Sequence, residues 1–195
     1  ERLDLSQTQV TGSGLEHLSG PAKLLVLDLS RSRITDAGLS KYNLGMGTLP
    51  ALPKGRRILV PGQVADDASI RLGTTDVSDN RSLLAAVRQA NPAAVVIYKP
   101  HPDVEAGLRE GAVPEAGELA DVVLSRVDPI AAIDAVDAVW TMTSLLGFEA
   151  LLRGKAVTCL GQPFYAGWGL TDDRAMPIPR RTARLDIIAL AHAAL

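Results

Sequence analysis

Short apolar runs alternate with helical patterns over residues 56–195, and this alternation leaves few folds open to the chain. Each run is apolar throughout, as expected of strands buried on both faces of a sheet. Five such runs occur, at residues 58–60, 94–98, 121–124, 138–141 and 156–160. Helical patterns fill the intervals at 81–90, 129–136 and 144–153, and a last one covers 185–195. The order predicts an α/β fold, a Rossmann-like parallel sheet with helices on both faces.

Unusual residues follow four of the five predicted strands. In open parallel sheets, ligands bind beyond the carboxyl ends of the strands, so these residues are expected to share one edge. They are Gln63, Asp66 and Asp67 after the first strand, Lys99, His101 and Pro102 after the second, Thr143 and Ser144 after the fourth, and the loop 161–171 after the fifth.

Thr143 and Ser144 precede a predicted helix, whose free N–H groups and positive dipole end favour a phosphate. They serve equally well as plain helix caps. His101 stands between two prolines, near Lys99, on a stiffened loop that suits a donor to a phosphate oxygen. The alternative is an ordinary exposed histidine.

Three carboxylates have candidate roles. Glu149 lies among apolar residues of the predicted helix 144–153, where it either accepts hydrogen bonds from a ribose diol or pairs with Arg153 in solvent. Asp66 and Asp67 follow a strand directly, so one is a candidate nucleophile or base and the other a turn cap. The sequence shows no clustered metal-binding pattern of His, Cys and carboxylates.

The loop 161–171 concentrates aromatic residues in a chain that is only 4% aromatic. Phe164, Tyr165 and Trp168 fall within five positions, after Gln162 and Pro163 and among glycines. A flexible backbone with flat stacking surfaces suits the wall of a ligand pocket. The alternative is a surface loop pinned by its aromatic side chains.

Residues 1–40 contain a repeat. The motif Leu-Asp-Leu-Ser at residue 3 recurs at residue 27, an offset of 27 − 3 = 24. A period of about 20–29 residues with Leu-x-Leu strands is typical of leucine-rich repeats. Two units bury little core, so they form either the end of a longer array, a structural remnant, or a surface for a protein partner. Residues 41–55 are rich in Gly and Pro and predict a linker to a domain at 56–195.

Composition excludes some functions. The net charge of −2 gives no electrostatic basis for binding nucleic acid. The lone cysteine, Cys159, lies in an apolar run and is expected in a buried strand of a cytoplasmic protein. Apolar runs of the 18 or so residues that span a bilayer do not occur. Because the chain opens on Glu1, we expect a piece of a longer protein.

Four ordered motifs give the chain a family resemblance. They are Pro61-Gly62-Gln63-x-x-Asp66-Asp67-Ala68-Ser69-Ile70, Tyr98-Lys99-Pro100-His101-Pro102-Asp103, Thr143-Ser144-Leu145-Leu146-Gly147-Phe148-Glu149-Ala150, and Gly161-Gln162-Pro163-Phe164-Tyr165-Ala166-Gly167-Trp168-Gly169-Leu170-Thr171. Over residues 39–195 the chain resembles the capsule-polysaccharide β-Kdo transferases of the KpsC type.

The resemblance implies the C-terminal, nucleotide-binding half of a GT-B glycosyltransferase module. Such a module transfers Kdo from CMP-Kdo with retention, to a lipid-linked or Kdo acceptor. It implies that Lys99, His101, Pro102, Thr143 and Ser144 hold the CMP phosphate and that Glu149 holds the ribose. Asp67, or failing that Asp66, becomes the nucleophile. Gln63, Gln162, Pro163, Phe164, Tyr165 and Trp168 line the donor pocket.

The resemblance implies no cofactor and no metal beyond the donor substrate. It also implies peripheral association with the inner membrane, where the lipid-linked acceptor lies. The family's N-terminal domain, with its acceptor-side residues, has no counterpart in the sequence. Because half a cleft can bind nucleotide yet catalyse little, a non-catalytic nucleotide-sugar or protein-binding module stays open as an alternative.

Overall fold

Two short strands near the N-terminus pair in parallel. The computed structural model describes residues 2–4, 26–28 and 48–194. The chain divides into two units, residues 1–44 and 45–195. In the first unit, β1 (Arg2–Asp4) pairs with β2 (Val26–Asp28), and Leu3 lies opposite Leu27. This register equals the 24-residue offset of the sequence repeat. The helical part of the predicted repeat lies outside the described residues, and the leucine-rich repeat stays a prediction.

The second unit is an α/β layer structure built on one sheet. Its elements in chain order are β3 (Arg57–Pro61), α1 (Ala68–Gly73), α2 (Asn80–Ala90), β4 (Val95–Lys99), α3 (Pro102–Glu105), α4 (Ala116–Leu119), β5 (Val122–Val123), α5 (Pro129–Asp134), β6 (Ala138–Thr141), α6 (Leu145–Leu152), β7 (Ala156–Cys159), β8 (Asp172–Asp173) and α7 (Ile187–Ala194).

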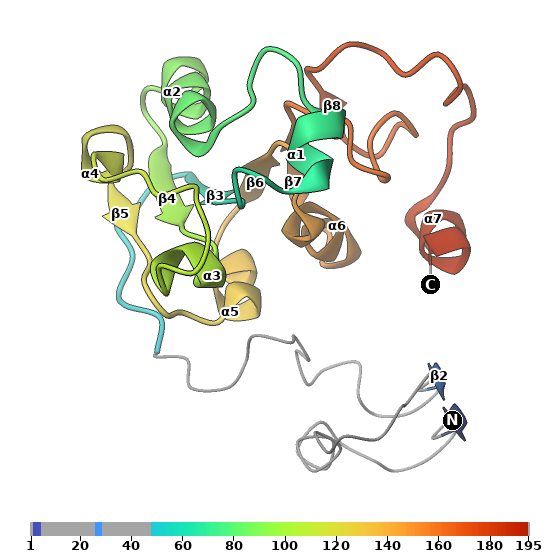
Figure 1. The fold of residues 1–195 in the computed structure, drawn as a ribbon, viewed down its shortest axis with the longest axis horizontal. Coiled ribbons are helices and arrows are strands. Elements are labelled where there is room, and N and C mark those ends of the chain that lie inside the picture. Colours follow the sequence, from blue (N-terminus) through green and yellow to red (C-terminus); the bar gives the residue numbers. More distant parts are fainter. Residues whose placement is uncertain (1, 5–25, 29–47, 195) are drawn as a thin grey trace. The chain divides into compact units, whose positions relative to one another are not determined.

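All neighbouring strands in this sheet are parallel, in the order β5-β4-β3-β6-β7-β8. The chain runs outward from β3 to β5, then returns to β6 and runs outward the other way (Figure 1). The order therefore reverses between β3 and β6, the position where ligands bind in doubly wound sheets. The Rossmann-like fold predicted from the sequence is confirmed.

Helices cover both faces of the sheet. Side chains alternate along β3, so that Ile58 and Val60 pack with one apolar layer and Leu59 packs with the other. In the first layer, α2 contributes the fully buried Leu83, Leu84 and Val87. Residues of α5, α6 and α7 and of the aromatic loop join the second layer. In Figure 1, α2 lies above the strands and α5 below them.

Local sequence explains where several elements begin and end. Asp79 caps α2 through the Ser82 N–H, and Ser144 caps α6 through the Leu146 N–H. After α6, Gly154 adopts a φ of 69°, a conformation that glycine adopts without steric cost. These boundaries match the predicted helices within one or two residues.

The predicted strands also match, but four short elements do not appear in the sequence prediction. They are α1, α3, α4 and β8. Strand β8 consists of two exposed aspartates, contrary to the expectation that every strand is apolar. Within the part of the chain that the structure describes, the longest helix is α2 with 11 residues, and no helix has the length and apolarity that crossing a bilayer requires.

Candidate functional site

The segments that follow β3, β4, β6 and β7 meet at one edge of the sheet, because these strands are parallel neighbours. Hydrogen bonds tie the segments together. The Gly62 N–H donates to the carbonyl of Lys99 at 2.7 Å, and the Tyr165 hydroxyl donates to the carbonyl of Ser144. We call this edge the rim; it comprises residues 62–69, 99–103, 141–149 and 161–171.

Gln63 lies at the reversal point of the sheet and joins two strand ends. Its side-chain nitrogen donates to Thr143 Oγ1 at 2.7 Å, and its side-chain oxygen accepts from the Thr143 N–H at 3.0 Å. Thr141 adds a hydroxyl bond to the same oxygen at 3.2 Å. Gln63 is only 7% exposed, so its amide is part of the internal structure of the rim.

Asn80 fixes the backbone of Gln63 through its side-chain amide. Its side-chain oxygen accepts from the Gln63 N–H at 2.9 Å, and its nitrogen donates to the carbonyls of Gln63 and Gly111 at 2.7 Å each. These three bonds use most of the hydrogen-bonding capacity of the amide. A small pocket of about 80 Å³ lies here, between the segments 63–65, 78–81 and 111–113.

The adjacent carboxylates Asp66 and Asp67 have different surroundings. Asp66 pairs with Arg109 Nη2 at 2.7 Å, and this hydrogen bond lowers the pKa of Asp66. Asp67 caps α1, where it accepts from the Ser69 N–H at 2.8 Å. Hydrogen bonds from the Ser69 hydroxyl and N–H lower the pKa of Asp67, and the charges of Arg109 and His101 act in the same direction. Both carboxylates are exposed and ionised near neutral pH.

His101 is held in a defined orientation. Its Nδ1 accepts from the Asp103 N–H at 3.2 Å, at the start of α3, and Pro102 occupies the first turn. In a neutral ring, the proton then lies on Nε2, which can donate. Lys99, at the end of β4, is 3% exposed. Burial lowers the pKa of Lys99, while the nearby carboxylates Glu105 and Asp128 counteract this shift.

Glu149 stands out electrostatically on α6. Its Oε2 is buried and has no hydrogen-bond partner among the described residues. Burial raises the pKa of Glu149, Arg153 opposes the shift and Asp128 adds to it. Glu149 forms no hydrogen bond with Arg153, because the Arg153 guanidinium bonds the Asp134 carboxylate at 3.2 Å. A buried acceptor of this kind is costly unless a ligand donates to it.

The aromatic loop splits into inner and outer parts. Tyr165 is fully buried and donates its hydroxyl to the carbonyl of Ser144, so its ring packs inside the core and does not line a pocket surface. Phe164 is 40% exposed and packs edge-on against Phe148 and Tyr165. Trp168 is half-buried, with its Nε1 donating to the Phe164 carbonyl at 2.7 Å.

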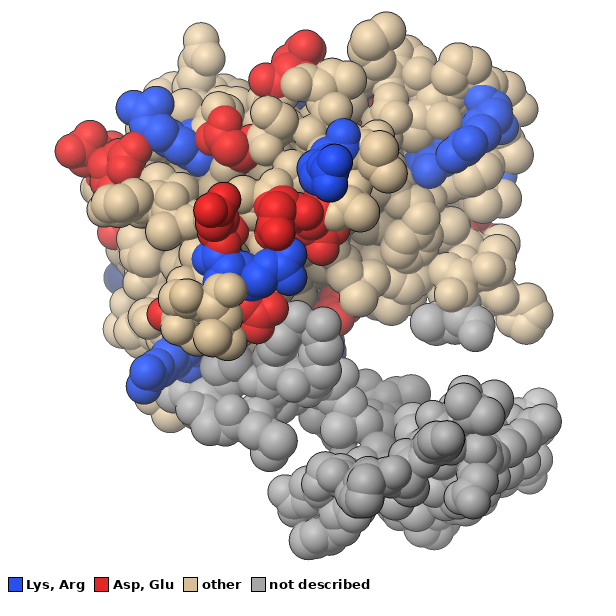
Figure 2. All heavy atoms as spheres, in the orientation of Figure 1, with Lys and Arg blue, Asp and Glu red and all other residues tan. Residues whose placement is uncertain are grey.

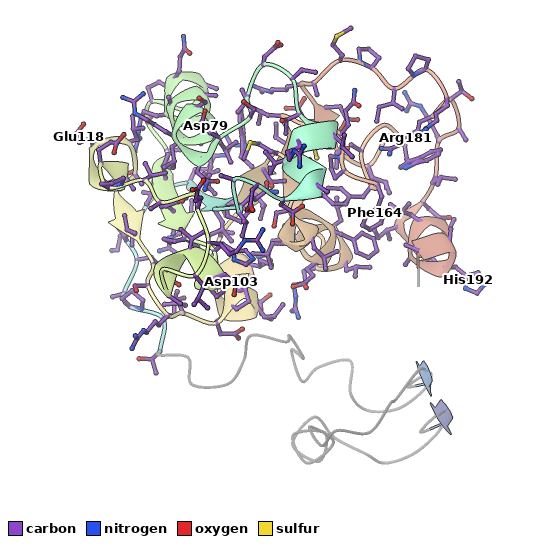
Figure 3. All side chains as sticks on the ribbon, in the orientation of Figure 1. Asp79, Asp103, Glu118, Phe164, Arg181 and His192 are labelled. Carbon is purple, nitrogen blue, oxygen red and sulfur yellow. The ribbon has the colours of Figure 1, made fainter. Side chains whose placement is uncertain are left out.

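A C-terminal segment fastens this loop. Arg181 donates to the carbonyls of Pro163 and Ala166, and its guanidinium lies 5.6 Å from the centre of the Trp168 ring. Gln162 donates to the Met176 carbonyl at 2.9 Å. Figure 3 places Phe164 and Arg181 near each other, far from Glu118, which lies on α4 beside the edge strand β5. The loop therefore presents Phe164 and part of Trp168 from a braced backbone.

Several residues that hold the rim in place were missing from the sequence prediction. Thr141, Asn80, Arg109 and Arg181 bond rim residues that are distant in the sequence. Asn80 adjoins the start of the predicted helix 81–90, a position typical of helix caps, so its sequence position does not indicate the network it forms here. Across residues 48–194 and the two N-terminal strands, no three His, Cys, Asp or Glu side chains gather in a geometry that could hold a metal ion. Acidic and basic side chains are interspersed on the face seen in Figure 2.

Comparison with known proteins links this rim to one family. A family described as "Capsule polysaccharide biosynthesis protein" matches residues 28–195. The capsule polysaccharide modification protein LipA of Neisseria meningitidis serogroup A is 50% identical over 166 residues, which are 83% of this chain and 23% of LipA. The lipopolysaccharide-processing protein LpsZ of Rhizobium meliloti is 48% identical over 168 residues, 84% of this chain and 38% of LpsZ.

Two solved structures from Thermosulfurimonas dismutans share the fold. KpsC, described as a β-Kdo 2,7 transferase, is 43% identical with a TM-score of 0.64, and the match covers 75% of this chain and 46% of that one. KpsC, described as a β-Kdo 2,4 transferase, is 34% identical with a TM-score of 0.69, and the match covers 80% and 50%. This chain thus spans half or less of the length of these relatives.

Proposed function

Since this chain belongs to the capsule polysaccharide biosynthesis protein family, we propose that it is the donor-binding half of a glycosyltransferase. The proposed reaction moves Kdo from CMP-Kdo, with retention of configuration, to a lipid-linked or Kdo acceptor. The observation that carries the proposal is the 43% identity to a β-Kdo 2,7 transferase over a shared fold. The rim supplies a group for each part of such a donor.

The phosphate of CMP would bind between His101 and the start of α6. His101 can donate from Nε2, because its Nδ1 accepts the Asp103 N–H. The start of α6 would contribute the positive end of its helix dipole, because the N–H groups of Thr143 and Leu146 already bond the side chains of Gln63 and Ser144. The buried ammonium of Lys99 adds positive charge beneath the site.

The ribose would bind Glu149. Its Oε2 has no internal hydrogen bond, and a vicinal diol presents two donors to one carboxylate. Binding would therefore supply the partner that the folded chain does not. Ribose binding would therefore explain why the rim contains a carboxylate whose pKa is raised by burial.

Asp67 is the proposed nucleophile. One carboxylate oxygen forms a bond to the anomeric carbon of Kdo while the bond to the phosphate oxygen breaks and CMP leaves with the electron pair. The acceptor hydroxyl then forms the new glycosidic bond, its proton passes to a base, and Asp67 is released as a carboxylate. Two inversions give net retention. Asp66 suits this role less because Arg109 holds it at 2.7 Å.

Phe164 and Trp168 would form one wall of the sugar site. Phe164 exposes 40% of its surface although its ring is anchored against Phe148. Aromatic faces pack well against the apolar faces of sugar rings. A lipid-linked acceptor would place the protein at the inner membrane surface, and the β1–β2 unit would offer a surface to a protein partner.

Calorimetric titration with CMP and CMP-Kdo tests the proposal. We expect saturable binding that His101→Ala weakens by at least tenfold, the loss of one charge-assisted hydrogen bond. Arg180→Ala, an exposed arginine that is not a residue of the rim, is the matched control and should bind as the wild type does. Absence of binding at millimolar CMP would contradict the proposal. Binding without any transfer by the full-length protein would favour a non-catalytic nucleotide-sugar-binding module.

A further inference from the structure

The backbone pairing between β3 and β6 ends before these strands reach the rim. Its last pair of residues is Leu59 and Val139. By contrast, β3 pairs with β4 as far as Pro61, and β6 pairs with β7 as far as Thr141. The ends of β3 and β6 therefore separate from each other at the position where the sheet order reverses, which is where ligands bind in sheets of this kind.

The side chain of Gln63 spans this separation. Its oxygen accepts from the Thr141 hydroxyl at 3.2 Å and from the Thr143 N–H at 3.0 Å, and its nitrogen donates to Thr143 Oγ1 at 2.7 Å. Because a backbone N–H can only donate, the oxygen of the amide must face Thr143, and the orientation of the amide is determined. Both acceptor positions of the amide and one of its two donors are used inside the protein.

The backbone of Gln63 is fixed independently of β6. The side chain of Asn80, on α2, accepts from the Gln63 N–H at 2.9 Å and donates to the Gln63 carbonyl at 2.7 Å. The preceding N–H, of Gly62, donates to the Lys99 carbonyl at 2.7 Å and so continues the pairing of β3 with β4. The Gln63 amide is therefore a rigid link from β3 and α2 to the end of β6.

Thr141 carries this link to the start of α6. It is fully buried, and its Oγ1 donates to Gln63 and accepts from the Ser144 N–H at 3.1 Å. The two successive N–H groups before α6 are thus bonded, that of Thr143 by Gln63 and that of Ser144 by Thr141. Together the two side chains fix residues 141–144, which we call the β6–α6 connection.

We propose that Gln63 and Thr141 are positioning residues, which hold the β6–α6 connection in the geometry that receives the phosphate of the donor without contacting the donor themselves. The inference rests on the proposed binding of the CMP phosphate between His101 and the start of α6. It gives Gln63 a different task from the pocket lining that the family resemblance implies. Gln63 is 7% exposed and Thr141 is fully buried, so both act on a ligand through the connection. Small displacements of a binding group are costly, which gives the link its importance.

Calorimetric titration of the full chain with CMP and with cytidine tests the proposal, because cytidine lacks only the phosphate. The ratio of the Kd for cytidine to the Kd for CMP measures what the phosphate contributes. Thr141→Val keeps the branched shape and removes the hydroxyl, and Gln63→Leu removes the amide. We expect each variant to lower this ratio by about fivefold, the effect of one net hydrogen bond, with the Kd for cytidine unchanged. Thr141→Ser keeps the hydroxyl and should restore the wild-type ratio.

Thr158→Val is the matched control. Thr158 is also a buried threonine of the sheet, on β7 opposite Trp140 of β6, but its hydroxyl bonds Asp172 and not the β6–α6 connection. Its ratio should equal that of the wild type. A general loss of folded protein raises the apparent Kd of both ligands by the same factor, so the ratio separates positioning from lowered stability.

Two results would contradict the proposal in different ways. If the wild type binds CMP no better than cytidine, the proposed phosphate site fails, and the inference fails with it. If the wild type prefers CMP and His101→Ala lowers the ratio, but folded Thr141→Val and Gln63→Leu keep it, the positioning role alone is overturned. Should one of these two variants not fold, the other decides, because each removes the partner of a different N–H.

Discussion

Gly147→Ala is expected to destabilise the protein, although alanine is the better helix former. Gly147 lies in α6 directly against Tyr165. An added Cβ would lie 2.7 Å from Cζ of Tyr165 and closer still to its hydroxyl oxygen. Tyr165 cannot easily move, since it is fully buried and its hydroxyl bonds the Ser144 carbonyl. The glycine is therefore a packing requirement that locks the aromatic loop onto α6.

The size of the effect follows from opposing contributions. Alanine in a helix interior gains about 1 kcal/mol over glycine. Overpacking a rigid core costs roughly 1–3 kcal/mol, and expelling a buried aromatic ring instead costs about 3–5 kcal/mol. We expect a net loss of ~2 kcal/mol, which in a unit of this size lowers Tm by about 4–8 °C.

Thermal unfolding by circular dichroism measures this loss, with Gly117→Ala as the matched control. Gly117 also lies in a helix, α4, but an added Cβ there meets nothing within 4 Å. Its Tm should stay or rise slightly. Because Tyr165 holds the start of α6, Gly147→Ala should also weaken CMP binding, by about tenfold. A Gly147→Ala variant as stable as the wild type would show that Tyr165 does not pack rigidly against residue 147.

Three further changes probe the same region. Glu149→Gln should raise Tm at neutral pH. Burial raises the pKa of Glu149 above its unfolded value of 4.5, so the wild-type protein loses stability as the pH rises from 4.5 through the folded pKa. The gain in Tm from glutamine should therefore vanish below pH 4.5, where Glu149 is protonated in both states. Arg181→Ala should cost ~1–2 kcal/mol by freeing two carbonyls of the loop and should shift Trp168 fluorescence to longer wavelength, whereas exposed Arg180→Ala should do neither. Asn80→Asp should cost roughly 2–4 kcal/mol in urea unfolding, because a carboxylate oxygen would replace the amide nitrogen that faces two carbonyls. An Asn80→Asp variant with wild-type stability would contradict the buried network.

The sheet could be predicted because its strands are buried on both faces. Strand β6 occupies the predicted residues 138–141, and β3, β4 and β7 differ by one or two residues at their ends. A continuous apolar run between turn residues needs no tertiary information to be recognised. Strand β8 lacked this pattern because it is a short, exposed edge, and α3 and α4, four residues each, carry too little periodicity.

That the segments of the rim share one edge of the sheet could also be predicted, but not the contacts of each side chain. Parallel topology brings strand ends to one edge, so the sequence order of Gln63, His101 and Thr143 was sufficient to group them. That Gln63 and Thr143 bond each other depends on two strands being neighbours in space. Likewise, only the close packing of Tyr165 against Gly147 in the folded structure shows that Tyr165 points into the core while Phe164 stays at the surface.

Mass spectrometry of the full-length protein after brief incubation with CMP-Kdo and no acceptor would detect the covalent intermediate on Asp67. We expect a mass increase of one Kdo residue, located on the peptide that carries Asp67 and lost on addition of acceptor. Asp67→Asn should stay unmodified while still binding CMP. Transfer of Kdo by an Asp67→Asn variant, or an adduct on another residue, would show that Asp67 is not the nucleophile.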